Sequence, residues 1–434
     1  MPSSEVSEQM SSTLSPKTVD NAREIGVDVI RQRLDAFRSS TDFDDLWPDV
    51  NEGLRHAAHR QIFAVTRCVL NDTAEDRHLP AGDEGEIRAL GIAGYASGMG
   101  PLLGYWIETG AITADPPVAA LLGEHLAHGR SRADEIFRHC IRLFGALGER
   151  EVVPTLMKGV YTSRRFFPEP GVRPMADLDL LIRPSERSAA EEALESLGFL
   201  ETATSRGQAS WSPPGGSNTV QSLELDHRSN PWSVDLHTSI DRSLTGGFWA
   251  RMGQVPFEAL CPWDIDGHTV RVFAQPLLLV HLAVHAATNI HELQLVGLVE
   301  MALVIREGVK SGDLQWDSAL DLINELGVAR FAHPTLELTE RLVPGILDPS
   351  FRAQGLSMTA GRVGRVIDQR ISSGLSMGGR RSADEIIVWA RGPLEFLKAV
   401  ACVLRDQGIT ALLKLCLSRL RLLMRRRRSW RTGS

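Results

Sequence analysis

Residues 175–182, with the sequence MADLDLLI, place two aspartates inside an apolar run. The apolar residues predict a β-strand, on which side chains point alternately to the two faces. Asp177 and Asp179 would then share one face, and Leu178 and Leu180 the other. Two carboxylates at this spacing repel each other unless a cation lies between them. The stretch therefore predicts either a cation site or two acids on the solvated face of an antiparallel sheet. The short D-x-D spacing alone does not separate these alternatives.

A third aspartate strengthens the case for a cation site. Asp235 lies in the stretch SVDLH, where it alternates with Val234 and Leu236 and so faces away from the apolar side of a strand. Mg²⁺ prefers oxygen ligands and typically takes one or two carboxylates together with substrate phosphates. Three carboxylates on adjacent strands can hold two divalent ions that support in-line displacement at phosphorus. We predict a site for Mg²⁺, or Mn²⁺, formed by Asp177, Asp179 and Asp235.

Basic residues near the acidic pair are candidates for binding phosphate. Lys158 and Gly159 follow a short apolar stretch, TLM, which predicts a strand followed by a loop, and Arg173 lies just before the acidic pair. Cationic side chains can neutralise charge on a reacting phosphoryl group. Glycine lets the backbone come close to a phosphate. The alternative is that these residues are ordinary surface charges and an ordinary turn.

Three histidines have two possible roles each. His281 and His285 are four residues apart in an apolar helical stretch, so they share one face, either as structural residues in helix contacts or as residues that line a cleft. The H-E-x-x-H pattern of metalloproteases is absent, because leucine follows His281. His237 follows Asp235 by two residues and shares its strand face, so it is either a partner of the acids or an exposed strand residue.

Hydrophobic periodicity divides the chain into helical and strand-rich segments, which indicates an α+β fold with a small mixed β-sheet core flanked by N- and C-terminal helical regions. The expected segments are a disordered tail over residues 1–20, a helical region over 21–150, the sheet core over 151–273, a helical region over 274–410 and a basic amphipathic tail over 411–434.

Within the core we expect the order strand, strand, helix, strand, strand. The stretch SERSAAEEALESLGF after Pro184 predicts the helix, with Gly198 as its stop. The last two strands are SLELDH (222–227) and WSVDLHTSI (232–240), which the turn-rich RSNP would join as an antiparallel hairpin.

Composition excludes several classes of protein. Hydrophobic residues make up 43% and charged residues 23% of the chain, which is typical of globular domains rather than disordered ones. The net charge of −7 argues against a long nucleic acid as a partner. The five cysteines are scattered without C-x-x-C spacing, which favours neither a zinc site nor a disulfide framework and suits a reducing, cytoplasmic location. A spanning helix would need an apolar run of about 18 residues or more, which we do not find in the sequence.

The C-terminal stretch LLKLCLSRLRLLMRRRRSWRTGS combines leucine periodicity with clustered arginines. A basic amphipathic segment can contact an anionic membrane surface or an acidic protein partner. The alternative is a terminal helix that packs on the body and ends in a solvated tail.

The stretches TLMKGV, RPMADLDLLI, LELDHRSNPWSVDLHTSI and PLLLVHLAVHA together resemble an uncharacterised nucleotidyltransferase family of the polymerase-beta-like superfamily, over roughly residues 115–310. By this resemblance Lys158 and Gly159 match the glycine-containing loop, and Asp177, Asp179 and Asp235 match the metal-binding acids. Arg173 matches an arginine usual in the subgroup. The chain departs from the superfamily in one respect, because its loop reads Lys-Gly-Val where Gly-Ser or Gly-Gly is common.

The resemblance implies an enzyme that uses Mg²⁺ to transfer a nucleotidyl group from an NTP donor to an unidentified acceptor. Asp177 and Asp179 would bind metal and triphosphate, Asp235 would complete the metal site and help to deprotonate the acceptor, and Lys158 and Arg173 would contact phosphates. The alternative is a non-catalytic nucleotide-binding or scaffold relative that acts through its helical faces and basic tail. The presence of all three acids favours the enzyme. Transfer of the γ-phosphoryl group by the same metal geometry is a further possibility.

Overall fold

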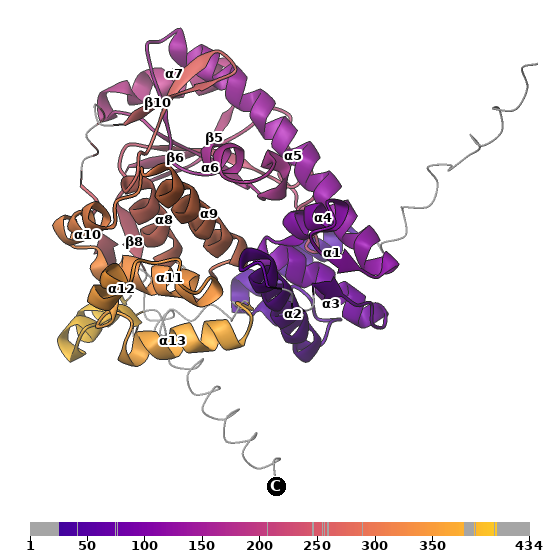
Figure 1. Cartoon of the computed structure of the whole chain (residues 1–434). Helices are drawn as coiled ribbons and strands as arrows, with labels where there is room; N and C mark the ends of the chain where they lie inside the picture. The colour runs from indigo at the N-terminus through magenta and orange to yellow at the C-terminus, as the bar shows by residue number, and fades with distance from the viewer. Residues whose placement is uncertain are drawn as a thin grey trace, which may run out of the picture.

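The computed structural model (Figure 1) describes residues 26–405, apart from residues 41, 74, 76, 206, 245–246, 254, 256, 258–259, 289, 377–385, 387 and 403. The tails expected over residues 1–20 and 411–434 lie outside the described residues. The helices of the first part of the chain are α1 (Val27–Ser40), α2 (Glu52–Leu70), α3 (Glu84–Ser97), α4 (Gly100–Glu108) and α5 (Pro116–Gly148), with a short strand pair formed by β1 (His78–Leu79) and β2 (Thr113–Ala114).

A mixed sheet forms the centre of the molecule, so the expectation of an α+β fold is confirmed. Its strand order is β10-β11-β3-β4-β7-β6-β5. The strands are β3 (Thr155–Leu156), β4 (Asp177–Leu181), β5 (Leu200–Ser205), β6 (Gln208–Ser212), β7 (Ser233–His237), β10 (Cys261–Ile265) and β11 (His268–Val272). β4 pairs in parallel with β7 and antiparallel with β3.

The two faces of β4 pack against different helices, as the alternation of its side chains requires. Leu178 and Leu180 belong to the same hydrophobic cluster as residues of α5 and of α7 (Arg187–Ser196). The long helix α5 runs along the outside of the sheet (Figure 1). Leu181 belongs instead to the cluster that contains α8 (Leu277–Ala287). The apolar side of β4 therefore faces α5 and α7, and its acidic side faces the C-terminal helices.

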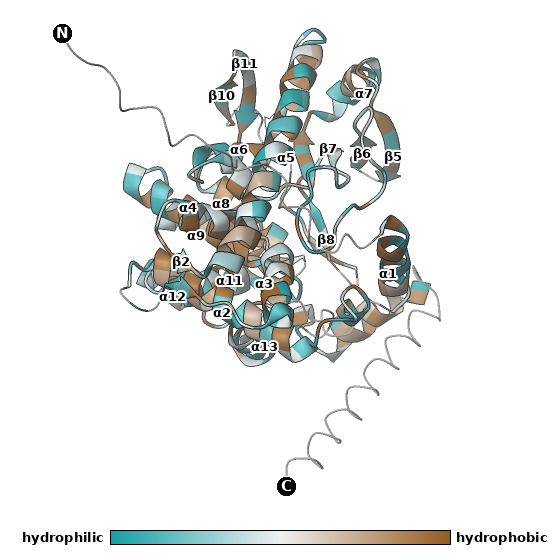
Figure 2. Cartoon of the chain, turned by 90° about the vertical axis from the view of Figure 1, so that its right-hand side faces the viewer, coloured by the Kyte–Doolittle hydropathy of each residue, from teal (hydrophilic) through white to brown (hydrophobic). Residues whose placement is uncertain are grey.

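The C-terminal helices share one core with the N-terminal ones, because buried residues from both regions form a single hydrophobic cluster. These helices are α8, α9 (Leu295–Ser311), α10 (Trp316–Glu325), α11 (Ala329–Leu342), α12 (Pro349–Gly355) and α13 (Gly361–Ser372). The residues of α8 itself are mostly hydrophobic on all sides of the helix (Figure 2), which is typical of a fully buried helix. Within the described part of the chain, no helix combines the length and the apolar character needed to cross a bilayer.

The expected hairpin of residues 222–227 and 232–240 is wrong. Residues 222–227 are not a strand; β7 pairs antiparallel with β6, and β5 and β6 form the hairpin that the sequence analysis missed. The Ser222 hydroxyl accepts bonds from the backbone of Glu224 and Leu225, and the Asn230 side-chain oxygen accepts bonds from the backbone of Gln221 and Ser222. These side chains occupy the backbone donors that a strand would need, which favours a loop over a ladder.

Other local differences are smaller. The loop expected after the first strand is largely a helix, α6 (Val160–Arg165), which follows Gly159. Two further hairpins do not follow from the sequence pattern: β10–β11 at the edge of the sheet, and a separate pair formed by β8 (Arg242–Leu244) and β9 (Phe248–Ala250). The helix expected after Pro184 is present as α7, and Gly198 beyond its end has a positive φ of 82°.

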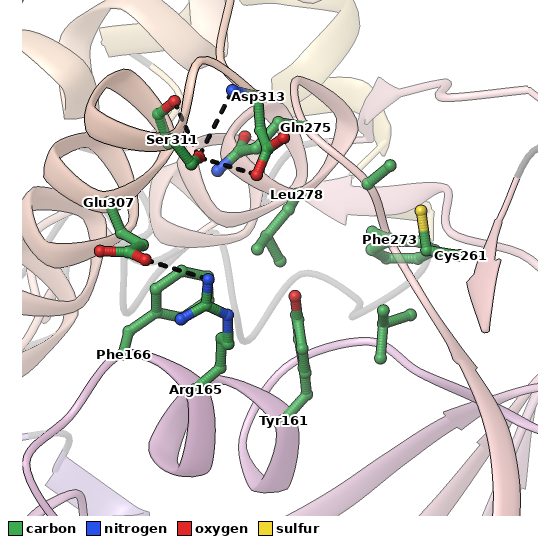
Figure 3. A pocket seen from close by; sticks show the side chains of 13 residues that line it. Tyr161, Arg165, Phe166, Cys261, Phe273, Gln275, Leu278, Glu307, Ser311 and Asp313 are labelled. Carbon is green, nitrogen blue, oxygen red and sulfur yellow. Dashed lines mark hydrogen bonds and ion pairs between the residues drawn. The ribbon is translucent and has the colours of Figure 1, made fainter. Parts of the chain in front are cut away.

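A cavity of about 240 Å³ lies between α6, the end of β11 and α9 (Figure 3). Tyr161, Phe273 and Leu278 give it apolar walls, and an ion pair of 3.0 Å between Arg165 and Glu307 lies at its side. None of the residues predicted to form the acidic site lines this cavity.

Candidate functional site

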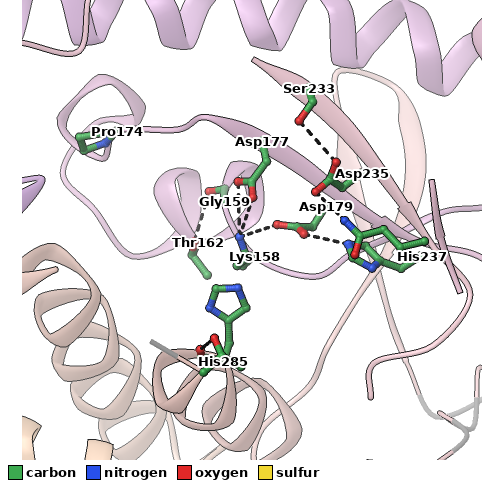
Figure 4. Close-up of polar contacts among 12 residues, drawn as sticks. Lys158, Gly159, Thr162, Pro174, Asp177, Asp179, Ser233, Asp235, His237 and His285 are labelled. Carbon is green, nitrogen blue, oxygen red and sulfur yellow. Dashed lines mark hydrogen bonds and ion pairs between the residues drawn. The ribbon is translucent and has the colours of Figure 1, made fainter. Parts of the chain in front are cut away.

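The parallel pairing of β4 with β7 brings the three predicted acids together (Figure 4). Asp179 is the register partner of Asp235, and Asp177 is the partner of Ser233. Register partners on adjacent strands point to the same face of a sheet, so all three carboxylates lie on one side. The Asp179 side chain is only 4% exposed and that of Asp177 38%. A solvated sheet face therefore does not describe Asp179, whereas Asp177 lies at its partly exposed edge.

Lys158 lies between the two aspartates of β4. It follows β3, the antiparallel neighbour of β4, and its Nζ is 2.5 Å from Asp179 Oδ2 and 3.3 Å from Asp177 Oδ2. Gly159 next to it has a φ of 64°, a left-handed conformation that glycine adopts without strain, and α6 starts there. Lys158 is buried, and a buried cation needs anionic partners of this kind.

The charges of the cluster shift one another's pKa. Burial alone would lower the pKa of Lys158, but Asp179 and Asp177 outweigh it and raise that pKa. Burial would likewise raise the pKa of Asp179, but Lys158 and the hydrogen bond with His237 hold it well below its usual range. Burial and the nearby charge of Asp179 raise the pKa of Asp177. The cluster is therefore an ionised Lys158–Asp179 pair, with Asp177 as the carboxyl that protonates more easily.

His237 is a partner of the acids rather than an exposed strand residue. Its Nε2 is 2.9 Å from Asp179 Oδ1, on the opposite side of that carboxylate from Lys158. One ligand atom each from Asp179, Asp235 and His237 lie within 4.8 Å of one another, which is a geometry that can hold a metal ion. Gln208 of β6, which the sequence analysis did not identify, donates to Asp235 Oδ2 at 2.9 Å and orients it.

Arg173 has protein partners for its whole guanidinium group. Its Nε and Nη2 are 2.8 and 3.0 Å from the carboxylate oxygens of Glu300 on α9, and its Nη1 donates to the Pro174 carbonyl oxygen at 3.3 Å. The Thr162 hydroxyl on α6 donates to the same Glu300 carboxylate. Burial would lower the pKa of Arg173, but Glu300, Asp177 and Asp179 raise it. Arg173 therefore lies close to the acids, and its contact with phosphate stays a prediction.

Helix α8 supplies the opposite wall of the site. The His285 ring points toward Lys158 (Figure 4), so this histidine lies beside the acidic cluster. His281 is fully buried beside Phe273, with ring centroids 5.1 Å apart. Burial lowers the pKa of both imidazoles well below the usual range, and neighbouring cations add to the effect. Both rings are therefore neutral.

A further cation, Arg242, belongs to this neighbourhood, although no local motif marks it in the sequence. It is the first residue of β8. Its charge lowers the pKa of Asp179, although burial, Lys158 and His237 have larger effects on that pKa. Its Nε and Nη2 atoms are buried and have no hydrogen-bond partner among the described residues. A buried guanidinium nitrogen without a hydrogen-bond partner is costly, and an anionic ligand would relieve that cost.

Comparison with known proteins gives one match. A family model described as "Uncharacterised nucleotidyltransferase" matches residues 89–344. The matched segment runs from α3 to the end of α11 and contains every residue of the acidic cluster. No curated protein matches, and no solved structure matches.

Proposed function

We propose, because the chain belongs to this uncharacterised nucleotidyltransferase family, that it transfers a nucleotidyl group from an NTP to an acceptor with the help of a divalent ion, Mg²⁺ or Mn²⁺. The observation that carries the proposal is the placement of Asp177, Asp179 and Asp235 on one face of β4 and β7, with the buried Lys158 between the first two. Clustered carboxylates at a partly exposed sheet face suit phosphate chemistry better than a structural role, because a purely structural core would avoid their mutual repulsion.

The residues of the cluster fit a divalent ion. Their donor set consists of carboxylate oxygens and the imidazole of His237, and the Lys158 ammonium between two of the carboxylates occupies the kind of position a cation takes. Asp179, Asp235 and His237 would hold the ion together with phosphate oxygens, and Asp177 would stay paired with Lys158 beside it. When bound, the ion neutralises phosphate charge and orients the triphosphate for in-line attack.

The protein's own groups have distinct tasks in this proposal. The acceptor oxygen attacks the α-phosphorus, the bond from that phosphorus to the bridging oxygen breaks, and pyrophosphate leaves. Lys158 and Arg242 stabilise the charge that builds up on the phosphate oxygens. Asp235 helps to take the proton of the acceptor hydroxyl. Arg173, Glu300 and Thr162 keep α6 and the segment before β4 in place.

The test is calorimetry of NTP binding with Mg²⁺ and with Mn²⁺, on the wild-type chain and on the double variant Asp177→Asn, Asp179→Asn. We expect metal-dependent binding that the double variant loses. Asp264→Asn, an exposed carboxylate on β10, is the matched control and should bind normally. Incubation of a cell extract with α-labelled and with γ-labelled NTP then separates nucleotidyl from γ-phosphoryl transfer. The proposal is wrong if no NTP binds with either ion, or if only the γ-label reaches an acceptor.

A further inference from the structure

Lys158 occupies a position that a two-ion site would need for one of its ions. Two-ion centres place their ions about 3.5–4 Å apart and use carboxylates that contact both. Here the Lys158 ammonium lies 3.3 Å from Asp177 Oδ2 and 2.5 Å from Asp179 Oδ2. Lys158 is 7% exposed and so does not leave this place without exposing buried carboxylates to each other.

The second oxygen of Asp179 faces a different set of groups. His237 Nε2 lies 2.9 Å from Asp179 Oδ1, and Asp235 is the register partner of Asp179 on β7. Ligand atoms of these three residues lie within 4.8 Å of one another, whereas Asp177 is not part of the group. Asp179 thus resembles a carboxylate that bridges two cations, with one oxygen toward the ammonium and the other toward the space between Asp235 and His237.

We propose that the centre binds a single divalent ion, held by Asp179, Asp235 and His237, and that the Lys158 ammonium permanently takes the place of a second ion. The inference deepens the proposed function and rests on its divalent-ion site, but it does not require nucleotidyl transfer to occur.

Charge balance supports one ion rather than two. The three carboxylates carry three negative charges when ionised, which one dication and the ammonium neutralise. A second dication beside Lys158 would place like charges within contact distance in a buried site, and such pairs are strongly unfavourable.

The ligand set also indicates which ions bind best. An imidazole with two carboxylates suits Mn²⁺ and later transition metals, whereas Mg²⁺ prefers oxygen ligands alone. Mn²⁺ is therefore a suitable probe, and its binding can be followed without any nucleotide.

The experiment titrates Mn²⁺ into the full chain without NTP and follows free Mn²⁺ by electron paramagnetic resonance. We expect one ion per wild-type chain. His237→Ala should weaken binding by about tenfold or more, since the loss even of an outer partner typically costs about 10–100-fold. His268→Ala, on β11 of the same sheet, is the matched control and should bind like the wild type. Asp177→Asn should leave the affinity within about threefold, a change of less than about 1 kcal/mol.

Variants of Lys158 test directly whether its ammonium takes the place of a second ion. Lys158→Met removes the ammonium and should raise the stoichiometry to two ions, whereas Lys158→Arg keeps the charge and should retain one. If Lys158→Met does not fold, as judged by circular dichroism, the His237→Ala and Asp177→Asn comparison still decides the proposal.

Three results would overturn the inference. These are two bound ions in the wild type, no saturable Mn²⁺ binding, or a loss of Mn²⁺ affinity in Asp177→Asn as large as that in His237→Ala. A chain that binds one Mn²⁺ through His237 but binds no NTP would contradict the proposed function and leave this inference standing. A chain that binds NTP with two ions would support the proposed function and contradict this inference.

Discussion

Arg173 forms a bidentate ion pair with Glu300, which joins the segment before β4 to helix α9 across a wide separation in sequence. Both side chains are buried, with 12% and 6% of their surface exposed. Thr162 on α6 donates to the same carboxylate, so three elements around the acidic cluster meet at Glu300. The pair fixes the scaffold on which Lys158 and the two aspartates of β4 are placed.

Replacement of Glu300 by glutamine should destabilise the protein strongly. The substitution leaves Arg173 as a buried charge without its counter-ion, and breaking a buried pair in this way typically costs about 3–5 kcal/mol. Urea denaturation measures the loss. Glu307→Gln, which breaks the more exposed pair with Arg165, should cost at most about 1 kcal/mol. Equal effects of the two substitutions would contradict this account.

Arg132 on α5 clamps the two strands that carry the acids. Its Nε donates to the Met175 carbonyl oxygen at 2.7 Å, and its Nη1 and Nη2 donate to the carbonyl oxygens of Asn230 and Pro231 at 2.6 and 2.8 Å. These carbonyls lie just before β4 and β7, so the clamp supports the register that pairs Asp179 with Asp235.

Arg132→Met should therefore affect both stability and the site, although Arg132 contacts none of the three acids of the site. Loss of several charge-assisted hydrogen bonds to buried carbonyls should lower the free energy of unfolding by at least about 3 kcal/mol. Mn²⁺ binding, measured well below the melting temperature, should also weaken. Arg142→Met, an exposed position on the same helix, is the control. Wild-type stability for Arg132→Met would show that the clamp has no energetic role.

Much of the site could be predicted from sequence because it depends on local pattern. Alternation in DLDLL and SVDLH places the acids on one strand face, and the same alternation places His237 with them. Glu300 and Arg242 could not be found in this way. They reach the site through tertiary packing, from a helix and a hairpin distant in sequence, and neither belongs to a local motif.

The errors in the fold have physical causes as well. SLELDH alternates like a strand, but Ser222 and Asn230 bind the backbone donors that the strand would have used. Strand β5 was missed for the opposite reason. It is a strand, but its residues LETATS are all exposed and show no hydrophobic alternation. An edge strand of this kind is specified by its partner β6 rather than by its own pattern.

The largely buried carboxyl of Asp226 should make the free energy of unfolding depend on pH. Burial raises the pKa of Asp226 to about 6, and Arg132 opposes the shift. The folded-state pKa lies above the unfolded value near 3.9. The stability that depends on protonated Asp226 is therefore fully present below about pH 4 and is lost as the pH rises through about 6.

Asp226→Asn removes this titration. Its free energy of unfolding relative to the wild type should increase between pH 4 and pH 7, by up to about 3 kcal/mol for a shift of two pKa units. Urea denaturation across this range measures the difference. A difference that stays constant or falls with rising pH would contradict the assignment of Asp226 as a carboxyl protonated by burial.

Arg242 should contribute directly to NTP binding. Two of its buried nitrogens have no partner among the described residues, and its charge already acts on Asp179 and on both histidines of α8. A triphosphate oxygen would supply the missing acceptor, and a hydrogen bond to a charged group contributes about 1.5–3 kcal/mol. Arg242→Gln should thus weaken NTP binding by about 10–100-fold and reduce its sensitivity to salt, because one phosphate contact is lost. Arg251→Gln, an exposed arginine just beyond β9, should change neither property. Unchanged affinity in Arg242→Gln would mean that its guanidinium serves the fold, and the triphosphate would then depend on Lys158 and Arg173.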